Sequence, residues 1–345
     1  MGRVTLKTVA ERVGVSPMTV SNAFSRPDQL SAALRRRILD AAAELGYVGP
    51  DPAARTLAKG STGTVGILLT KTLRYAFTDE FSAVFLASIA EGLAEAGLAL
   101  TLLPPEGTGD VVPARDVAMD AAIVYSCGLD AEGLDWLRRR RLPLVQVDQP
   151  PDPKMTSINI EDRSGAFAVA EHVVQLGHRR VALLVIETED ADVDEAGSHQ
   201  ENRMLGWLDA LTPAGIEPVV VRCEISTEES AFAAARGLFD APDRPTAVLC
   251  FSDAAAAGAL RAARAAGLDV PADVTIVGFD DSPLARRTDP PLTTVRQDAE
   301  RKGQITATAI VEALERKRAG RPQRVEHIML PTELVVRESS GPPPR

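Results

Sequence analysis

The chain has 345 residues, of which 45% are hydrophobic and 25% are charged, so it is ordinary globular material with enough length for two or three cores. Residues 1–60 hold nine basic and five acidic side chains, a net charge of +4. Because the whole chain carries −10, residues 61–345 carry −14. No apolar run approaches a membrane span and no signal-peptide core opens the sequence, so we expect a cytoplasmic protein with no membrane partner.

The first predicted element is an amphipathic helix near the amino terminus. Its apolar residues fall at i, i+3, i+4 and i+7, which places them on one face: Leu6, Val9, Ala10 and Val13. Thr5 suits the N-cap, and Gly14 suits the left-handed residue that ends the helix. A turn at this glycine brings the next helix across the first.

A second helix follows, with Ser16 as its cap and Pro17 at its first position. At about 100° per residue, one side is mixed and unsuited to a core, and it holds Pro17, Ser21, Ser25, Met18 and Asn22. The other side carries Thr19, Ala23, Val20 and Phe24. This pair of helices predicts a helix-turn-helix, in which the second helix reads the major groove of DNA.

The head continues with a third helix and a linker. Residues 31–46 carry a buried stripe and end at a glycine, while the arginines at 35–37 point outward, either into solvent or towards phosphates. Residues 48–63 follow, in which Pro and Gly bracket a short helix-favouring run that is marginal alone in water.

Short apolar runs then alternate with alanine-rich helical stretches. The predicted strands are 64–70, 98–103, 121–125, 143–147, 156–160, 181–186, 217–222, 246–251 and 274–279. The predicted helices are 79–96, 163–176, 199–211, 228–239, 253–266 and 298–318. Continuous apolar strands joined by helical crossovers indicate parallel sheets, so we expect an α/β body of two doubly wound subdomains behind an all-α head. Open sheets of this kind bind ligands beyond the carboxyl ends of their strands.

Four stretches of the sequence resemble the lactose-repressor (LacI/GalR) family of transcriptional regulators. They are residues 4–10, 15–21, 44–47 and 52–57, and the similarity continues to the carboxyl-terminal region. The resemblance implies a helix-turn-helix domain over residues 1–50, a hinge helix and linker over 51–62, and a periplasmic-binding-protein-like body over 63–340. It also implies a repressor that binds pseudo-palindromic operator DNA as a homodimer, controlled allosterically by a small effector, such as a sugar, between the subdomains.

The head residues divide by their chemistry. Pro17 and Met18 offer only shape and apolar contact to bases, and Asn22 can bind adenine in a bidentate way. The residues suited to phosphates are Thr5, Ser16, Thr19, Ser21 and Ser25. The resemblance makes Leu57 a minor-groove wedge that kinks the duplex; the alternative is that it packs onto the body.

The resemblance also places the effector. Arg203 matches an effector-contacting arginine and Asp280 an acceptor for ligand hydroxyls, with Asp281 as the alternative. Further candidates are Ser252, Phe77 and Tyr125. Ser252 stands where the family commonly has asparagine. The alternative for Phe77 is a place in the core. Residues 187–200 form either a lid or a disordered loop.

We found no signature of catalysis, metal binding or cofactor binding. The four histidines lack metal-ligand spacing, the three cysteines form no CxxC pair, and neither a nucleophile elbow nor a phosphate-binding loop is present. A solute-binding transport protein and a sugar-processing enzyme are the competing classes. Whether the effector releases or promotes DNA binding, and whether the protein represses or activates, stays open.

Overall fold

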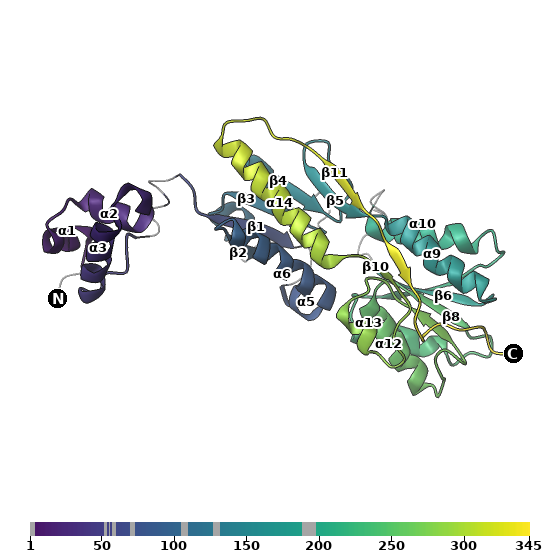
Figure 1. Ribbon diagram of the computed structural model, residues 1–345. Helices are drawn as coiled ribbons and strands as arrows, with labels where there is room; N and C mark the ends of the chain where they lie inside the picture. Colours follow the sequence, from purple (N-terminus) through teal and green to yellow (C-terminus); the bar gives the residue numbers. More distant parts are fainter. Residues whose placement is uncertain are drawn as a thin grey trace. The chain divides into compact units, whose positions relative to one another are not determined.

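The structure is a computed structural model that describes residues 4–51, 54, 56, 60–69, 73–104, 110–126, 132–187 and 198–345. Its contacts divide the chain into two compact units, Met1–Thr62 and Gly63–Arg345 (Figure 1). Leu57 lies outside the described residues, as does most of the 187–200 segment.

The head is a small bundle of three helices. They are α1 (Leu6–Val13), α2 (Pro17–Ser25) and α3 (Ala32–Glu44), with a 3₁₀ turn at Pro27–Gln29. The predicted caps are present: Thr5 and Ser16 accept hydrogen bonds from the backbone N–H groups three residues ahead, and Gly14 has a left-handed φ of 79°. These local signals fix where α1 ends and α2 begins.

The predicted apolar faces meet in one core. The buried residues at its centre are Val9, Ala10, Val20, Ala23, Ile38 and Ala42. Ala10 and Ala23 are small where the helices cross, and Val20 is completely buried between α1 and α3. Burying one such aliphatic side chain contributes about 1.5–3 kcal/mol, so this core holds α2 against the other helices.

The first subdomain of the body is built on a six-stranded sheet. In spatial order its strands are β11 (His327–Leu330), β5 (Thr156–Ile160), β4 (Leu144–Val147), β3 (Ala121–Tyr125), β1 (Thr64–Leu69) and β2 (Ala99–Leu103). Every pairing between neighbours is parallel. The carboxyl ends of β1, β3 and β4 therefore share one edge of the sheet.

Helices cover both faces of this sheet. The helices of the region are α5 (Leu73–Thr78), α6 (Glu80–Glu95), α7 (Pro113–Asp116), α8 (Glu132–Arg139) and α14 (Ala299–Arg318). α6 and α14 lie side by side on one face (Figure 1), and α7 and α8 cover the other. Gly303 permits the close approach of α14 to α6, because a Cβ there would lie 2.6 Å from the Cβ of Ser88.

The second subdomain is built on a four-stranded parallel sheet. Its strands are β7 (Val219–Cys223), β6 (Val181–Ile186), β8 (Ala247–Cys250) and β9 (Thr275–Val277). Its helices are α9 (Asp162–Gln175), α10 (His199–Leu211), α11 (Glu228–Ala235), a 3₁₀ turn at Arg236–Leu238, α12 (Asp253–Ala265) and α13 (Pro283–Arg287). α9 and α10 pack on one face, and α11 and α12 on the other.

The chain passes between the subdomains three times. It leaves the first after β5, returns after β10 (Thr294–Arg296) to form α14 and β11, and then leaves it again for β12 (Glu333–Val335), which pairs with β10 as a small antiparallel ribbon. The predicted fold class is confirmed, and each predicted strand is present with ends that differ by at most two residues. β10, β11 and β12 were not predicted.

Candidate DNA-reading helix and candidate ligand pocket

α2 presents two chemically distinct sides, as its sequence predicted. Val20 and Ala23 are completely buried, whereas Met18 is 68% exposed and Pro17 is also exposed. Asn22 is partly exposed beside them. The three residues expected to contact bases are therefore accessible on the head.

Asn22 has a partner that the sequence did not reveal. Its Nδ2 donates a hydrogen bond to Oε1 of Gln29, 3.1 Å away in the 3₁₀ turn after α2. This bond uses one of the two Nδ2 protons and leaves the other, together with Oδ1, for the edge of an adenine. Gln29 lies outside the helical periodicity that selected the other residues.

The hydroxyl groups expected at phosphates differ in what they have left to offer. Ser16 and Thr19 place their oxygens 2.8 Å apart while Ser16 caps α2, and Thr5 caps α1. The hydroxyl of Ser25 donates its single proton to the carbonyl of Ser21, 2.9 Å away. In this conformation Ser25 has no proton for a phosphate.

Two of the three consecutive arginines bind the head itself. Arg35 donates to the carbonyl of Ala23, 3.2 Å away, and Arg37 donates to the carbonyl of Val13, 3.3 Å away. Both carbonyls lie in the last turns of their helices, where cations are favoured by the helix dipole. These arginines stabilise α1 and α2 rather than forming only a solvated face.

The body contains a pocket of about 670 Å³, mouth included, at the carboxyl ends of the parallel strands. Four of the five predicted effector residues line it: Tyr125, Arg203, Ser252 and Asp280. Phe77 does not, because it is 65% exposed on α5, and Phe81 at the start of α6 lines the pocket instead. The other lining residues are Leu69, Ala76, Asp79, Ser82, Ser126, Asp148, His199, Ser226, Phe251 and Gln297.

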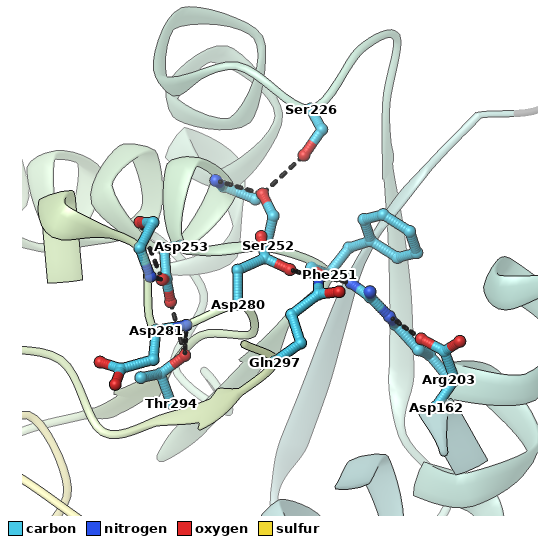
Figure 2. Close-up of polar contacts among 12 residues, drawn as sticks. Asp162, Arg203, Ser226, Phe251, Ser252, Asp253, Asp280, Asp281, Thr294 and Gln297 are labelled. Atoms are coloured by element: carbon cyan, nitrogen blue, oxygen red, sulfur yellow. Dashed lines mark hydrogen bonds and ion pairs between the residues drawn. The ribbon is translucent and has the colours of Figure 1, made fainter. Parts of the chain in front are cut away.

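Arg203 is contacted from three sides, and two of its partners, Asp162 and Phe251, are drawn in Figure 2. Its Nε donates to Oδ1 of Asp162, and its Nη1 donates to the carbonyl of Phe251, both over 2.7 Å. The guanidinium also lies 3.6 Å from the ring centroid of Phe279. Nη2 has no partner among the hydrogen bonds of the described residues, so it is the group of Arg203 that remains available to donate.

Asp280 lies 3.6 Å from Nη1 of Arg203 and accepts a hydrogen bond from Gln297 over 2.6 Å, both through Oδ1. Burial raises the pKa of Asp280 well above its usual value, and the nearby Arg203 opposes that shift. Within the described part of the chain, Oδ2 of Asp280 accepts no hydrogen bond. The structure thus offers an acceptor and a donor side by side at the pocket.

Asp281 has a different role from its neighbour. Burial alone would raise its pKa, but hydrogen bonds from Arg337 and Arg296 lower it. Asp253 accepts hydrogen bonds from Ser282 and Thr294 (Figure 2), and burial raises its pKa to about 7. Both carboxylates brace the loop after β9, and neither lines the pocket.

Three lining residues have backbone conformations that side-chain-bearing residues rarely adopt. Ser126, Asp148 and Asp280 have φ values of 52°, 54° and 118°. Each directly follows a strand or lies a few residues beyond its end. Such conformations cost of order 1–3 kcal/mol and cluster at binding sites, so their coincidence at one pocket indicates a functional site.

Ser252 is used locally in a way that limits its reach. Its oxygen accepts from the N–H of Ala255, capping α12, and lies 2.6 Å from the oxygen of Ser226 (Figure 2). Ser226 also lines the pocket, although its sequence context gave no signal. The pair is a small polar spot at the ligand side of the second subdomain.

The described residues contain no group of three or more His, Cys, Asp or Glu side chains arranged to hold a metal ion. In the same residues, no helix is both long enough and apolar enough to cross a bilayer.

Comparisons with known proteins identify the family of both parts of the chain. Residues 5–49 match the description "Bacterial regulatory proteins, lacI family", and residues 170–340 match "Periplasmic binding protein-like domain". The chain is 35% identical over 331 residues to the HTH-type transcriptional regulator IpsA of Corynebacterium glutamicum, covering 91% of this chain and 92% of that protein. The chain belongs to the LacI family of bacterial transcriptional regulators.

Two solved structures of this family share the whole architecture. A lac repressor dimer bound to operator and the anti-inducer ONPF has a TM-score of 0.79 at 27% identity, covering 99% of this chain and 100% of that one. A CelR–cellobiose complex has a TM-score of 0.70 at 29% identity, covering 98% and 100%. As a LacI-family member, the chain is a DNA-binding transcriptional regulator and not an enzyme, which also rejects the transport-protein alternative.

Proposed function

We propose that this regulator is a cytoplasmic repressor that binds a pseudo-palindromic operator as a homodimer, and that a neutral, polyhydroxylated ligand in the body pocket changes its operator affinity. The observation that carries the proposal is the Arg203–Asp280 pair, with one free donor group and one free acceptor oxygen beside each other. Among similar solved structures, the transcriptional regulator CelR is in complex with cellobiose, and a lac repressor dimer is bound to operator and the anti-inducer ONPF.

The charges around the pocket favour a ligand without an anionic group. Carboxylates of Asp79 and Asp148 border it, while Arg203 is already paired with Asp162. A hydroxyl group can donate to a carboxylate oxygen and accept from an arginine N–H at once. Aromatic side chains that line the pocket, such as Phe251 and Phe81, offer apolar surface to the C–H faces of a sugar ring.

On the DNA side, the accessible face of α2 supports base contacts from Pro17, Met18 and Asn22. The phosphate contacts that we propose come from Thr5, Ser16, Thr19, Ser21 and, after rotation of its hydroxyl, Ser25. One short helix reaches few bases, so two symmetric half-sites read by two subunits are needed for adequate specificity. This physical argument supports the homodimer.

Residues 51–62 are proposed as the hinge helix that joins head and body, with Leu57 as the wedge into the minor groove. A wedge contributes only where the duplex is bent at its specific site. Leu57→Ala should therefore weaken operator binding far more than binding to random DNA, as measured by gel shift with both probes. Equal losses on the two DNAs would contradict the wedge.

The ligand is tested by thermal shift of the full chain with pentoses, hexoses, cellobiose, nucleosides and sugar phosphates. We expect saturable stabilisation by a neutral compound, and a change in operator binding at the same concentration. Asp280→Asn should abolish both, whereas Asp289→Asn, at a side chain 94% exposed, should change neither. A ligand response that survives Asp280→Asn would place the ligand elsewhere.

A further inference from the structure

A lysine is completely buried directly behind the pocket wall. Lys302 on α14 is 0% exposed, and its ammonium lies 2.5 and 2.6 Å from the two carboxylate oxygens of Asp148 and 3.2 Å from Oε1 of Gln297. An ammonium has three protons to donate, so these three acceptors satisfy it. Removing such a charge from water is unfavourable unless it is paired, and packing alone does not require one.

Asp148 lies between this lysine and the pocket. It follows β4 with a left-handed φ of 54°, it lines the pocket, and its side chain is 12% exposed. The turn thus places the carboxylate of Asp148 next to the ammonium of Lys302, where a ligand anion would otherwise bind. The rings of Phe81 and Phe85, 5.4 and 5.9 Å from Nζ, surround the ammonium further.

The same lysine is linked to the ligand-facing groups. Gln297 accepts from Lys302 through Oε1 and donates through Nε2 to Asp280, so the orientation of its amide is fixed at both ends. Asp280 in turn approaches Arg203. Arg203 and Lys302 are therefore each matched to a carboxylate before any ligand arrives.

We propose that Asp148 is a built-in counter-ion that occupies the anion-binding position of Lys302, and that this pair excludes phosphorylated and acidic compounds from the pocket. The inference rests on the proposed ligand pocket and deepens it, since it names what the pocket rejects and by which residues. Lys302 acts through Asp148 and Gln297, so it is a positioning residue rather than a ligand contact.

Substitutions of Asp148 and of Lys302 are expected to change the ion preference of the pocket in opposite directions. Asp148→Asn keeps a side chain that tolerates a left-handed backbone but leaves the cation unmatched, so the pocket should gain affinity for glucose 6-phosphate, glucuronate or inorganic phosphate. Lys302→Met leaves the carboxylate unmatched, so the pocket should gain affinity for protonated glucosamine. The double variant should gain neither, because both charges are gone.

Calorimetric titration of the full chain at constant ionic strength measures these gains. We expect each single variant to bind its matching ion on the order of tenfold more tightly than the wild type, with wild-type behaviour for the double variant and for Lys317→Met, an exposed lysine on the same helix. Because the two single variants test opposite charges, either one can test the proposal if the other fails to fold.

Two results would overturn the inference. One is wild-type binding of an anion that Lys302→Met abolishes, since the lysine would then already be open to ligands. The other is the absence of any gain in folded single variants. A wild type that binds no neutral sugar would count against the proposed function only, because the ion titrations do not depend on the effector.

Discussion

Arg203 offers the sharpest test of the energetics of the body. Replacing it with alanine removes the partner of the buried Asp162 carboxylate and of the Phe251 carbonyl, and it leaves Asp280 without its nearest cation. Breaking a buried pair by removing one partner costs about 3–5 kcal/mol. With a urea m-value of about 1–3 kcal/mol/M, the unfolding midpoint should fall by about 1 M or more.

The same two helices provide a matched control. Arg163 on α9 binds Asp209 on α10 over 2.6 Å, almost the distance of the Arg203–Asp162 pair, but these side chains are 54% and 42% exposed. Water and salt screen an exposed pair, so Arg163→Ala should barely move the midpoint. Fluorescence of Trp207, buried on α10, reports unfolding of both variants. Equal shifts for the two substitutions would refute the assignment of the energy to burial.

Three further predictions concern pH, base preference and helix packing. Burial raises the pKa of Asp162 to about 6, and the charge of Arg203 opposes that shift. The folded protein therefore holds this proton more tightly than the unfolded chain does. The group stabilises the fold fully below about pH 4 and loses that contribution as the pH rises to about 6. The stability of the wild type relative to Asp162→Asn should therefore fall over this range by at most about 3 kcal/mol in urea unfolding, and a constant difference would contradict the shift. Gln29→Ala should relax the preference for the base opposite Asn22, within the about 1–3 kcal/mol that a bidentate contact supplies, and selection from random DNA would show an unchanged preference if the amide pair is irrelevant. Gly303→Ala should destabilise the body by about 1–3 kcal/mol through overpacking, whereas Gly237→Ala, with nothing within 4 Å of the added Cβ, should leave the melting temperature unchanged; equal melting temperatures for the two would be evidence against close packing.

The sequence predicted the elements whose signals are local. Caps such as Ser16 and the continuous apolar run of β6 act within a few residues, so they can be read directly. β11 was missed because it is a short edge strand in which only Leu330 is buried. Its partner β5 lies more than 160 residues away, and that pairing leaves no trace in either segment.

The ligand pocket was predicted in part. A family resemblance led to Arg203 and Asp280. Asp148 could have been predicted from the rule that ligands bind beyond strand ends, because it directly follows β4. Lys302 was not predictable, since its position on α14 is that of a core residue and its partner Asp148 lies 154 residues earlier, just after β4. Phe77 does not line the pocket, because its side chain on α5 is exposed to solvent.

The three passages between the subdomains have a consequence for how the protein is made. The first subdomain needs α14 and β11, and these come from residues 299–330. During synthesis the head and the second sheet are complete before the first sheet has its last strand, although that sheet begins first. On the ribosome, β5 therefore remains an unpaired edge strand, and one face of the sheet remains without α14, until nearly the whole chain has emerged. A truncated product ending before residue 299 would keep all three helices of the head on a body whose first sheet lacks α14 and β11.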